Sequence, residues 1–205
     1  MNDHDLLCTL LKRVSRSFYL TLKVVPGDVR RPIGLAYLFA RAADTIADTA
    51  LIGRADRLKY LEIFREVFRE DKTGRLLAIK EVLAERQQVA AERELLTRLD
   101  EGFSILHSLS PSDQAMIRDV VLTLTEGMVM DLATFPGEDE GRLVALQTRA
   151  DLDRYTYYVA GCVGEFWTEI HMAHRPSLAG WDREAMRRRG VRFGKGLQMT
   201  NVLRD

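Results

Sequence analysis

The sequence predicts an all-α protein, in which helices pack as a bundle around a core cavity. Three observations indicate this class: apolar residues make up 46% of the chain and recur at helical spacing, no stretch alternates with the period of a β-strand, and the five prolines lie mostly in turn contexts. A chain of 205 residues has the length of one domain, so residues 1–205 are expected to form a single domain.

Proline, glycine and short polar residues mark the ends of the expected helices. Val25-Pro26-Gly27-Asp28 ends the first helix, whereas Pro32 falls in the first turn of the second, where a missing N–H costs little. Ser110 has the character of an N-cap. The expected helices cover, in order, residues 4–23, 29–49, 56–69, 75–107 (as one helix or two), 111–134, 146–174 and 182–205.

Composition narrows the class of protein further. Thirty basic and thirty acidic residues cancel, so no nucleic-acid partner is expected. Two cysteines do not make a disulfide framework, and the N-terminus lacks the basic-then-apolar order of a signal peptide. No run reaches the ~18 apolar residues that a membrane span needs. These features predict a soluble, cytoplasmic protein; peripheral contact with a membrane and the oligomeric state stay open.

One stripe of the second expected helix carries an unusual set of polar side chains. Tyr37, Arg41, Asp44 and Asp48 follow each other at steps of four, three and four, which places them on one helix face. Their neighbours are alanine, isoleucine, leucine and phenylalanine, and buried charges must be paired or bound to metal. An exposed acid pair on an amphipathic helix is the alternative. A hard cation such as Mg²⁺, bridging the two carboxylates to an anionic substrate gripped by the arginine, would account for the whole stripe.

The last expected helix ends on a second motif with the same logic. Gln198, Asn201 and Asp205 share a face, and Arg204 lies beside them. A polar face of a terminal helix is the simpler explanation of this motif alone. Turned toward the first motif, however, it would complete a site for Mg²⁺ and diphosphate.

Two further segments stand out. Ser15-Arg16-Ser17-Phe18-Tyr19 offers hydroxyls, a guanidinium and aromatic rings, although a basic helix face beside core aromatics would look the same. Tyr155 begins a segment that runs to Gly164 and contains Gly161 three residues before its end. Each glycine inside a helix costs roughly 1 kcal/mol against alanine, so the backbone there must approach either another helix or a ligand.

Five segments in this order resemble the squalene/phytoene synthase family, the head-to-head isoprenoid synthases. The segments are Ser15 to Phe18, Tyr37 to Asp48, Gly127 to Asp131, Tyr155 to Gly164, and Gln198 to Asp205. The resemblance runs from about residue 10 to the last residue. It implies the all-α isoprenoid synthase fold with a central hydrophobic cavity.

The resemblance also implies roles for individual residues. Asp44 and Asp48 match the first aspartate-rich motif, which holds Mg²⁺ on the substrate diphosphate, and Asn201 and Asp205 match the start of the second. The expected diphosphate contacts come from Ser15, Arg16, Arg41, Gln198 and Arg204. Tyr37 and Tyr155 match tyrosines near the reacting carbons, and Phe18 would line the prenyl tunnel.

The chain departs from the family pattern in two places. Ala47 stands where the family often has an additional acid, and the chain stops at Asp205, where family members continue to a second acid and further helices. The single domain is therefore expected to lack the family's C-terminal helices.

The activity implied by the resemblance is that of a prenyltransferase in isoprenoid and lipid metabolism. It would join two farnesyl diphosphates head to head with Mg²⁺, giving presqualene diphosphate and then squalene, with NADPH as reductant, or dehydrosqualene without it. The alternatives are a phytoene synthase that uses geranylgeranyl diphosphate and a non-catalytic relative that serves as an assembly factor. A terpene cyclase on the same fold is less compatible with the Tyr158 to Gly164 segment.

Overall fold

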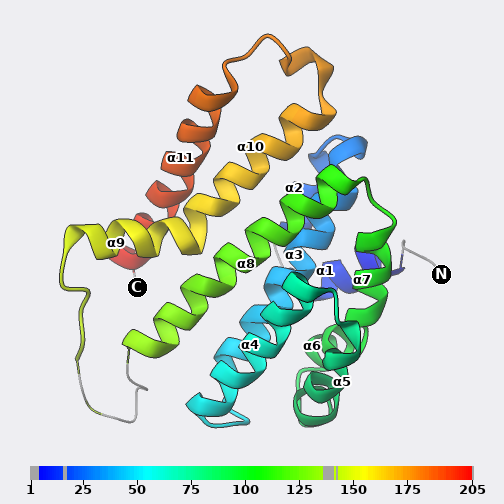
Figure 1. Ribbon diagram of the computed structural model, residues 1–205, viewed down its shortest axis with the longest axis vertical. Helices are drawn as coiled ribbons and strands as arrows, with labels where there is room; N and C mark the ends of the chain where they lie inside the picture. The colour runs from blue at the N-terminus through cyan, green and yellow to red at the C-terminus, as the bar shows by residue number, and fades with distance from the viewer. Residues whose placement is uncertain (1–4, 16–17, 136–140, 142, 205) are drawn as a thin grey trace. The chain divides into compact units, whose positions relative to one another are not determined.

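The computed structural model describes residues 5–15, 18–135, 141 and 143–204, and no β-strand occurs among them. The all-α prediction is therefore confirmed for the described chain (Figure 1). The chain divides into two compact units, Met1–Val121 and Leu122–Asp205. Helix α8 (Pro111–Thr134) runs through the boundary between the two units.

The expected helix over residues 4–23 is wrong as a single element. A π-helical segment, η1 (Asp5–Leu10), leads into α1 (Leu11–Val14), and α2 (Phe18–Val24) follows separately. Ser15 has φ −108° and ψ 2°, outside the helical region, and its carbonyl oxygen accepts the amide of Phe18 at 2.9 Å. Periodicity missed this break because apolar residues continue at helical spacing on both sides of it.

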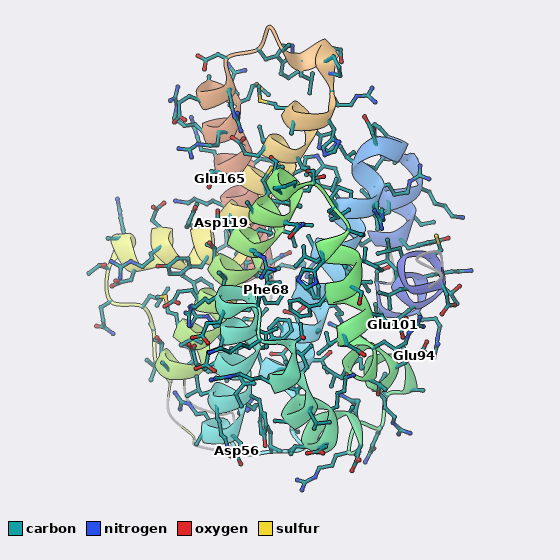
Figure 2. All side chains as sticks on the ribbon, turned by 45° about the vertical axis from the view of Figure 1, so that its right-hand side comes forward. Asp56, Phe68, Glu94, Glu101, Asp119 and Glu165 are labelled. Carbon is teal, nitrogen blue, oxygen red and sulfur yellow. The ribbon has the colours of Figure 1, made fainter. Side chains whose placement is uncertain are left out.

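The core of the first unit is built from aromatic side chains on three helices. These are α3 (Gly27–Asp48), α4 (Arg54–Glu70) and α7 (Leu99–His107), and the first two agree with the predicted helices. Phe39, Phe68 and Phe103 lie on one helix each, with ring centroids 4.8–4.9 Å apart, and all three are buried. Figure 2 shows Phe68 inside this unit. The cluster anchors α3 on one side, which leaves its polar stripe on the other.

Residues 75–107 form more elements than the one or two helices predicted. They contain η2 (Thr73–Arg75), α5 (Leu76–Ile79), η3 (Lys80–Ala84), α6 (Ala90–Thr97) and α7. The break before α6 is organised by Gln87, whose side-chain Oε1 accepts the amide of Val89 at 3.1 Å and whose backbone carbonyl accepts Nε of Arg93 at 2.7 Å. Glutamine is a good helix former by propensity, so its role at this break comes from these local side-chain and backbone bonds, which propensity does not predict.

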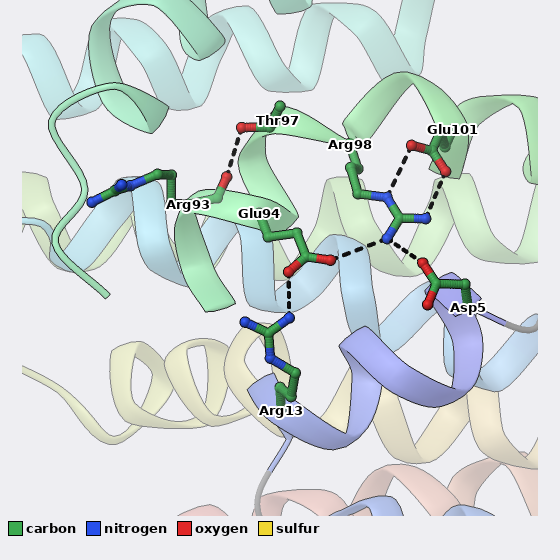
Figure 3. A network of polar contacts seen from close by, with 7 residues as sticks. All are labelled: Asp5, Arg13, Arg93, Glu94, Thr97, Arg98 and Glu101. Carbon is green, nitrogen blue, oxygen red and sulfur yellow. Dashed lines mark hydrogen bonds and ion pairs between the residues drawn. The ribbon is translucent and has the colours of Figure 1, made fainter. Parts of the chain in front are cut away.

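An ion-pair network ties the N-terminal segment to α6 and α7 (Figure 3). Arg98 donates to both carboxylate oxygens of Glu101 at 2.8 and 2.9 Å, and its Nη1 also reaches Asp5 at 2.6 Å and Glu94 at 3.1 Å. Arg13 pairs with the same Glu94. Several charges shared around one guanidinium hold a geometry better than an isolated surface pair does.

The second unit begins inside α8 and continues with α9 (Arg149–Thr156), a π-helical turn η5 (Tyr157–Gly161), α10 (Cys162–His174), η6 (Pro176–Leu178) and α11 (Arg183–Arg204). Thr148 and Asp151 form a capping box that starts α9 three residues after the predicted start at residue 146. The predicted N-cap of α8 is confirmed, because Oγ of Ser110 accepts the amide of Asp113 at 3.1 Å.

The glycines of this unit let two helices touch backbone to backbone. A Cβ added to Gly164 of α10 would lie 2.0 Å from the carbonyl oxygen of Gly190 on α11, and one added to Gly194 would lie 2.2 Å from that of Ala160. Of the two explanations open at the sequence level, helix approach is therefore correct for Gly164 (Figure 1 shows α10 and α11 side by side).

Among the helices of the described residues, none combines the length and the apolar character required to cross a bilayer.

Candidate functional site

The polar stripe of α3 lies on the part of the helix that the core leaves uncovered. Tyr37, Arg41 and Asp44 are partly buried and Asp48 is exposed, whereas most other residues of the second half of the helix are buried. The ring of Tyr37 stacks on Phe18 of α2 at 4.3 Å between centroids and 14° between planes. The structure thus brings Phe18, predicted to line the prenyl tunnel, into direct contact with Tyr37 of the first motif.

Arg41 is held by a carboxylate that the sequence reasoning missed. Its Nη2 donates to Oε1 of Glu92 on α6 at 2.6 Å, while its Nη1 lies 3.9 Å from Oδ2 of Asp44. The other carboxylate oxygen of Glu92 accepts Nε2 of the buried Gln87 at 3.0 Å. Glu92 is 51 residues from Arg41, and an acid in the first turn of a helix is too common to signal such a role.

The electrostatics of the stripe favour an additional cation. The pKa of Asp44 is raised to about 7, first by removal from water and then by the neighbouring Asp48; Arg41 opposes the shift, and Glu92 contributes to it. The single positive charge of Arg41 therefore compensates the surrounding carboxylates only in part, since it is shared between Glu92 and Asp44. A divalent cation at Asp44 would favour the ionised carboxylate.

The donor set of the stripe suits Mg²⁺. Two carboxylates one helical turn apart offer hard oxygen ligands, and Mg²⁺ is usually bound by one or two carboxylates together with waters and substrate phosphates. Within the described ranges, no group of three or more His, Cys, Asp or Glu side chains lies close enough to hold a metal by itself. This arrangement fits a Mg²⁺ ion that is held by the two carboxylates and takes its remaining ligands from water and substrate phosphate oxygens.

The break after α1 leaves a polar atom without a partner. Ser15 is 4% exposed, and its Oγ has no hydrogen-bond partner among the described residues. Nε of Arg41 is likewise buried and unpartnered, but so are Nε of Arg57 and Arg65, so the hydroxyl is the more informative of these atoms. Arg16, predicted to bind the same diphosphate, lies outside the described residues.

In the second unit, Tyr155 is the predicted residue with the best-defined surroundings. Its hydroxyl donates to Oδ1 of Asp131 on α8 at 3.2 Å, and its ring meets Phe135 edge to face at 6.3 Å. A cavity of about 670 Å³ opens beside it. The lining is mainly apolar and comes from Phe135, Leu146, Gln147, Thr148, Arg149, Leu152, Tyr155 and Val202.

The terminal motif is placed only in part. Gln198 is partly buried, Asn201 and Arg204 are exposed at the end of α11, and Asp205 lies outside the described residues. Val202, inside this motif, lines the same cavity as Tyr155. The first motif belongs to the first unit and the terminal motif to the second, so each set of predicted residues is supported by its own surroundings.

The described part of the chain is helical and presents paired aspartates beside an arginine, as the resemblance to the isoprenoid synthases implies. Comparison with known proteins agrees, since residues 11–205 match the family model described as squalene/phytoene synthase. The chain therefore belongs to the squalene/phytoene synthase family.

Individual relatives are similar over nearly the whole chain. The squalene synthase of Eremothecium gossypii is 28% identical over 96% of this chain, and that of Saccharomyces cerevisiae is 29% identical over 96%. A Botryococcus braunii squalene synthase is 30% identical, also over 96%. This chain spans 42%, 41% and 38% of the lengths of these three proteins, respectively.

A solved structure shares the fold. TcSQS in complex with the ligand E5700 superposes with a TM-score of 0.71 and 27% sequence identity, over all of this chain and 54% of that one. The predicted isoprenoid synthase fold is thus confirmed together with the family.

Proposed function

We propose that this chain carries out the Mg²⁺-dependent, head-to-head condensation of two farnesyl diphosphates to presqualene diphosphate, and its conversion to squalene or dehydrosqualene. Membership of the squalene/phytoene synthase family supports the class of reaction. The observation that carries the proposal is the stripe on α3, where Asp44 lies 3.9 Å from Arg41 and has a pKa raised to about 7. In such a site, Asp44 can bind a divalent cation and Arg41 can bind an anionic ligand.

In the first unit, the proposed task is to grip a diphosphate and make it a leaving group. Asp44 and Asp48 would hold Mg²⁺, which when bound neutralises charge on the departing diphosphate as a Lewis acid. Arg41, Ser15 and Arg16 would donate hydrogen bonds to phosphate oxygens; the unpartnered hydroxyl of Ser15 is consistent with this. Glu92 keeps the guanidinium of Arg41 in one orientation while Nη1 faces the acids.

Next to these proposed diphosphate-binding residues, aromatic side chains would protect the reacting carbons from water. Phe18 and Tyr37 present one stacked pair of rings, suited to the start of a prenyl chain and to stabilising positive charge through their faces.

In the second unit, the proposed role is to stabilise the carbocation that forms at the reacting carbons and to bind diphosphate through Mg²⁺. Tyr155 would face the reacting carbons from the wall of the 670 Å³ cavity. Asn201 and Asp205 would hold further Mg²⁺, and Gln198 and Arg204 would contact diphosphate oxygens, as the family motif implies. NADPH is the proposed reductant for the squalene-forming outcome.

A product assay tests the proposal. The chain is incubated with farnesyl diphosphate and Mg²⁺, with and without NADPH, and the organic extract is analysed by mass spectrometry. A C30 product that requires Mg²⁺ is expected, with squalene formed in the NADPH arm. A parallel arm with geranylgeranyl diphosphate gives a C40 product if the protein is a phytoene synthase. Intact substrate in all arms, although Mg²⁺ and pyrophosphate bind, would overturn the catalytic proposal in favour of a non-catalytic relative.

A further inference from the structure

The contact between Asp131 and Tyr155 is built by one turn of α8 against the end of α9 and the start of η5. A Cβ added to Gly127 would lie 2.8 Å from Cβ of Tyr158, so the α8 backbone closely approaches this segment. Asp131 comes one turn after Gly127, on the same face of α8, and Tyr155 comes one turn before Tyr158. Close approach at the first pair therefore brings the carboxylate and the phenol at the second pair within hydrogen-bond distance.

Among the described residues, the carboxylate of Asp131 makes one side-chain hydrogen bond. It is partly buried, and Tyr155 is the one hydrogen-bond or ion-pair partner of its side chain in that part of the chain. Burial raises the pKa of Asp131, while the bond from Tyr155 lowers it. A half-buried carboxylate without a cation is unfavourable in a purely structural role, where a neutral side chain would pack at lower cost.

The side chain of Tyr155 also lines the cavity. Phe135 and Val202 line the same cavity, and the rings of Tyr155 and Phe135 meet edge to face. Because the hydroxyl proton is directed at Asp131, the phenol oxygen keeps lone pairs with which it can interact with a further group.

We propose that Asp131 is a positioning residue for Tyr155: its carboxylate fixes the hydroxyl by accepting its proton in a hydrogen bond, and so presents an electron-rich phenol oxygen to positive charge developing in the cavity. This inference rests on the proposed function, which supplies the cationic species. A hydroxyl that donates to a carboxylate carries more negative charge on its oxygen, in a site of low dielectric where such polarisation is effective. The phenol stays neutral, because burial and the nearby carboxylate raise the pKa of Tyr155 to about 12.

A double-mutant cycle separates this role from simple helix packing. The variants are Asp131→Asn, Tyr155→Phe and the combination, with Asp119→Asn as matched control, since Asp119 is an exposed aspartate on the same helix (Figure 2). We expect Asp131→Asn to lower kcat for farnesyl diphosphate about tenfold or more with KM unchanged, and to have almost no further effect once Tyr155 is phenylalanine. The control keeps the original kcat. An equal loss in both backgrounds would overturn the proposal.

A second readout does not require turnover. With ¹³Cζ-tyrosine labelling, Tyr155 is assigned by the signal lost in Tyr155→Phe and followed by NMR from pH 9 to 12, a range that covers the onset of ionisation in the original protein and the lower midpoint expected for Asp131→Asn. We expect Asp131→Asn to shift its titration downward by about one pH unit, since a neutral partner no longer opposes the phenolate. An unchanged titration would refute the pairing. If no variant turns over while the titration shifts, the proposed function fails and the pairing stands.

Discussion

The two units of this protein build their candidate sites in different ways. In the first unit, contacts between side chains position the site. Aromatic rings of α4 and α7 pack against a ring of α3, and Gln87 and Glu92 hold Arg41 beside Asp44. In the second, backbone contact dominates, because glycines on α10 and α11 let the two helices touch. The charged motif of the first unit is partly buried, while Asn201 of the terminal motif is exposed.

The difference teaches that equal spacing does not mean equal chemistry. Both motifs place oxygen-bearing side chains one helical turn apart, but Asp44 is partly buried and its pKa is raised to about 7, whereas Asn201 is exposed. The pKa values of a motif, and its need for a counter-ion, depend on how far the fold removes its side chains from water.

The largest expected effect tests the backbone contact in the second unit. Gly190→Ala places a Cβ 2.4 Å from the carbonyl oxygen of Gly164, and backbone cannot move aside cheaply. We expect a loss of about 3 kcal/mol in the free energy of unfolding, measured by urea denaturation. Gly196→Ala on the same helix is the control: nothing lies within 4 Å of its added Cβ, and alanine there is expected to stabilise by up to about 1 kcal/mol. Equal effects at both positions would break the comparison.

Next in size is the effect of the first motif on the proposed activity. Asp44→Asn removes a proposed Mg²⁺ ligand and is expected to lower the rate of product formation about 100-fold. Asp56→Asn, an exposed aspartate on α4, serves as control and should retain full activity. Asn201→Ala is expected to lower the rate about tenfold. If Asn201→Ala lowers the rate as much as Asp44→Asn does, the difference in burial between the two motifs does not predict their contributions to the rate.

A smaller effect is expected when Arg41 loses its partner. Glu92→Gln leaves a partly buried guanidinium without its carboxylate and weakens the link from α6 to α3. We expect a loss of about 1–2 kcal/mol in unfolding free energy, because hydrogen bonds to charged groups contribute about this much. Glu85→Gln, exposed just before α6, is the matched control. No difference between the two variants would show that Arg41 is held by other groups.

The smallest effect concerns pH. The folded-state pKa of Asp44, about 7, lies above the ordinary aspartate value, so its contribution to stability is present at low pH and is lost as pH rises through 7. Relative to Asp44→Asn, the original protein should therefore lose stability between pH 5 and pH 8. The carboxyl is 43% exposed, which limits the change to under about 1 kcal/mol. Thermal unfolding at both pH values measures it, and a pH-independent difference would refute the assignment.

Local pattern predicted the long helices well and the short ones poorly. The helices now labelled α3, α4, α8 and α11 lie close to their predicted ranges, because each has sustained periodicity and a clear start or stop. The break at Ser15 and the division of residues 75–107 were missed. Both depend on side-chain contacts that hydrophobic periodicity does not register: the salt bridge from Arg13 to the distant Glu94, and the local bonds of the Gln87 side chain to Val89 and Glu92.

The sequence by itself determined the helical class, the stripe from Tyr37 to Asp48 and the family, since these depend on residue type and spacing along one chain segment. Only the tertiary structure decided that Gly164 serves helix packing, that Glu92 holds Arg41, and that Asp131 meets Tyr155. These are contacts between residues 24 to 51 positions apart, and local propensity carries no information about them. Their geometry follows from which helix faces are buried together.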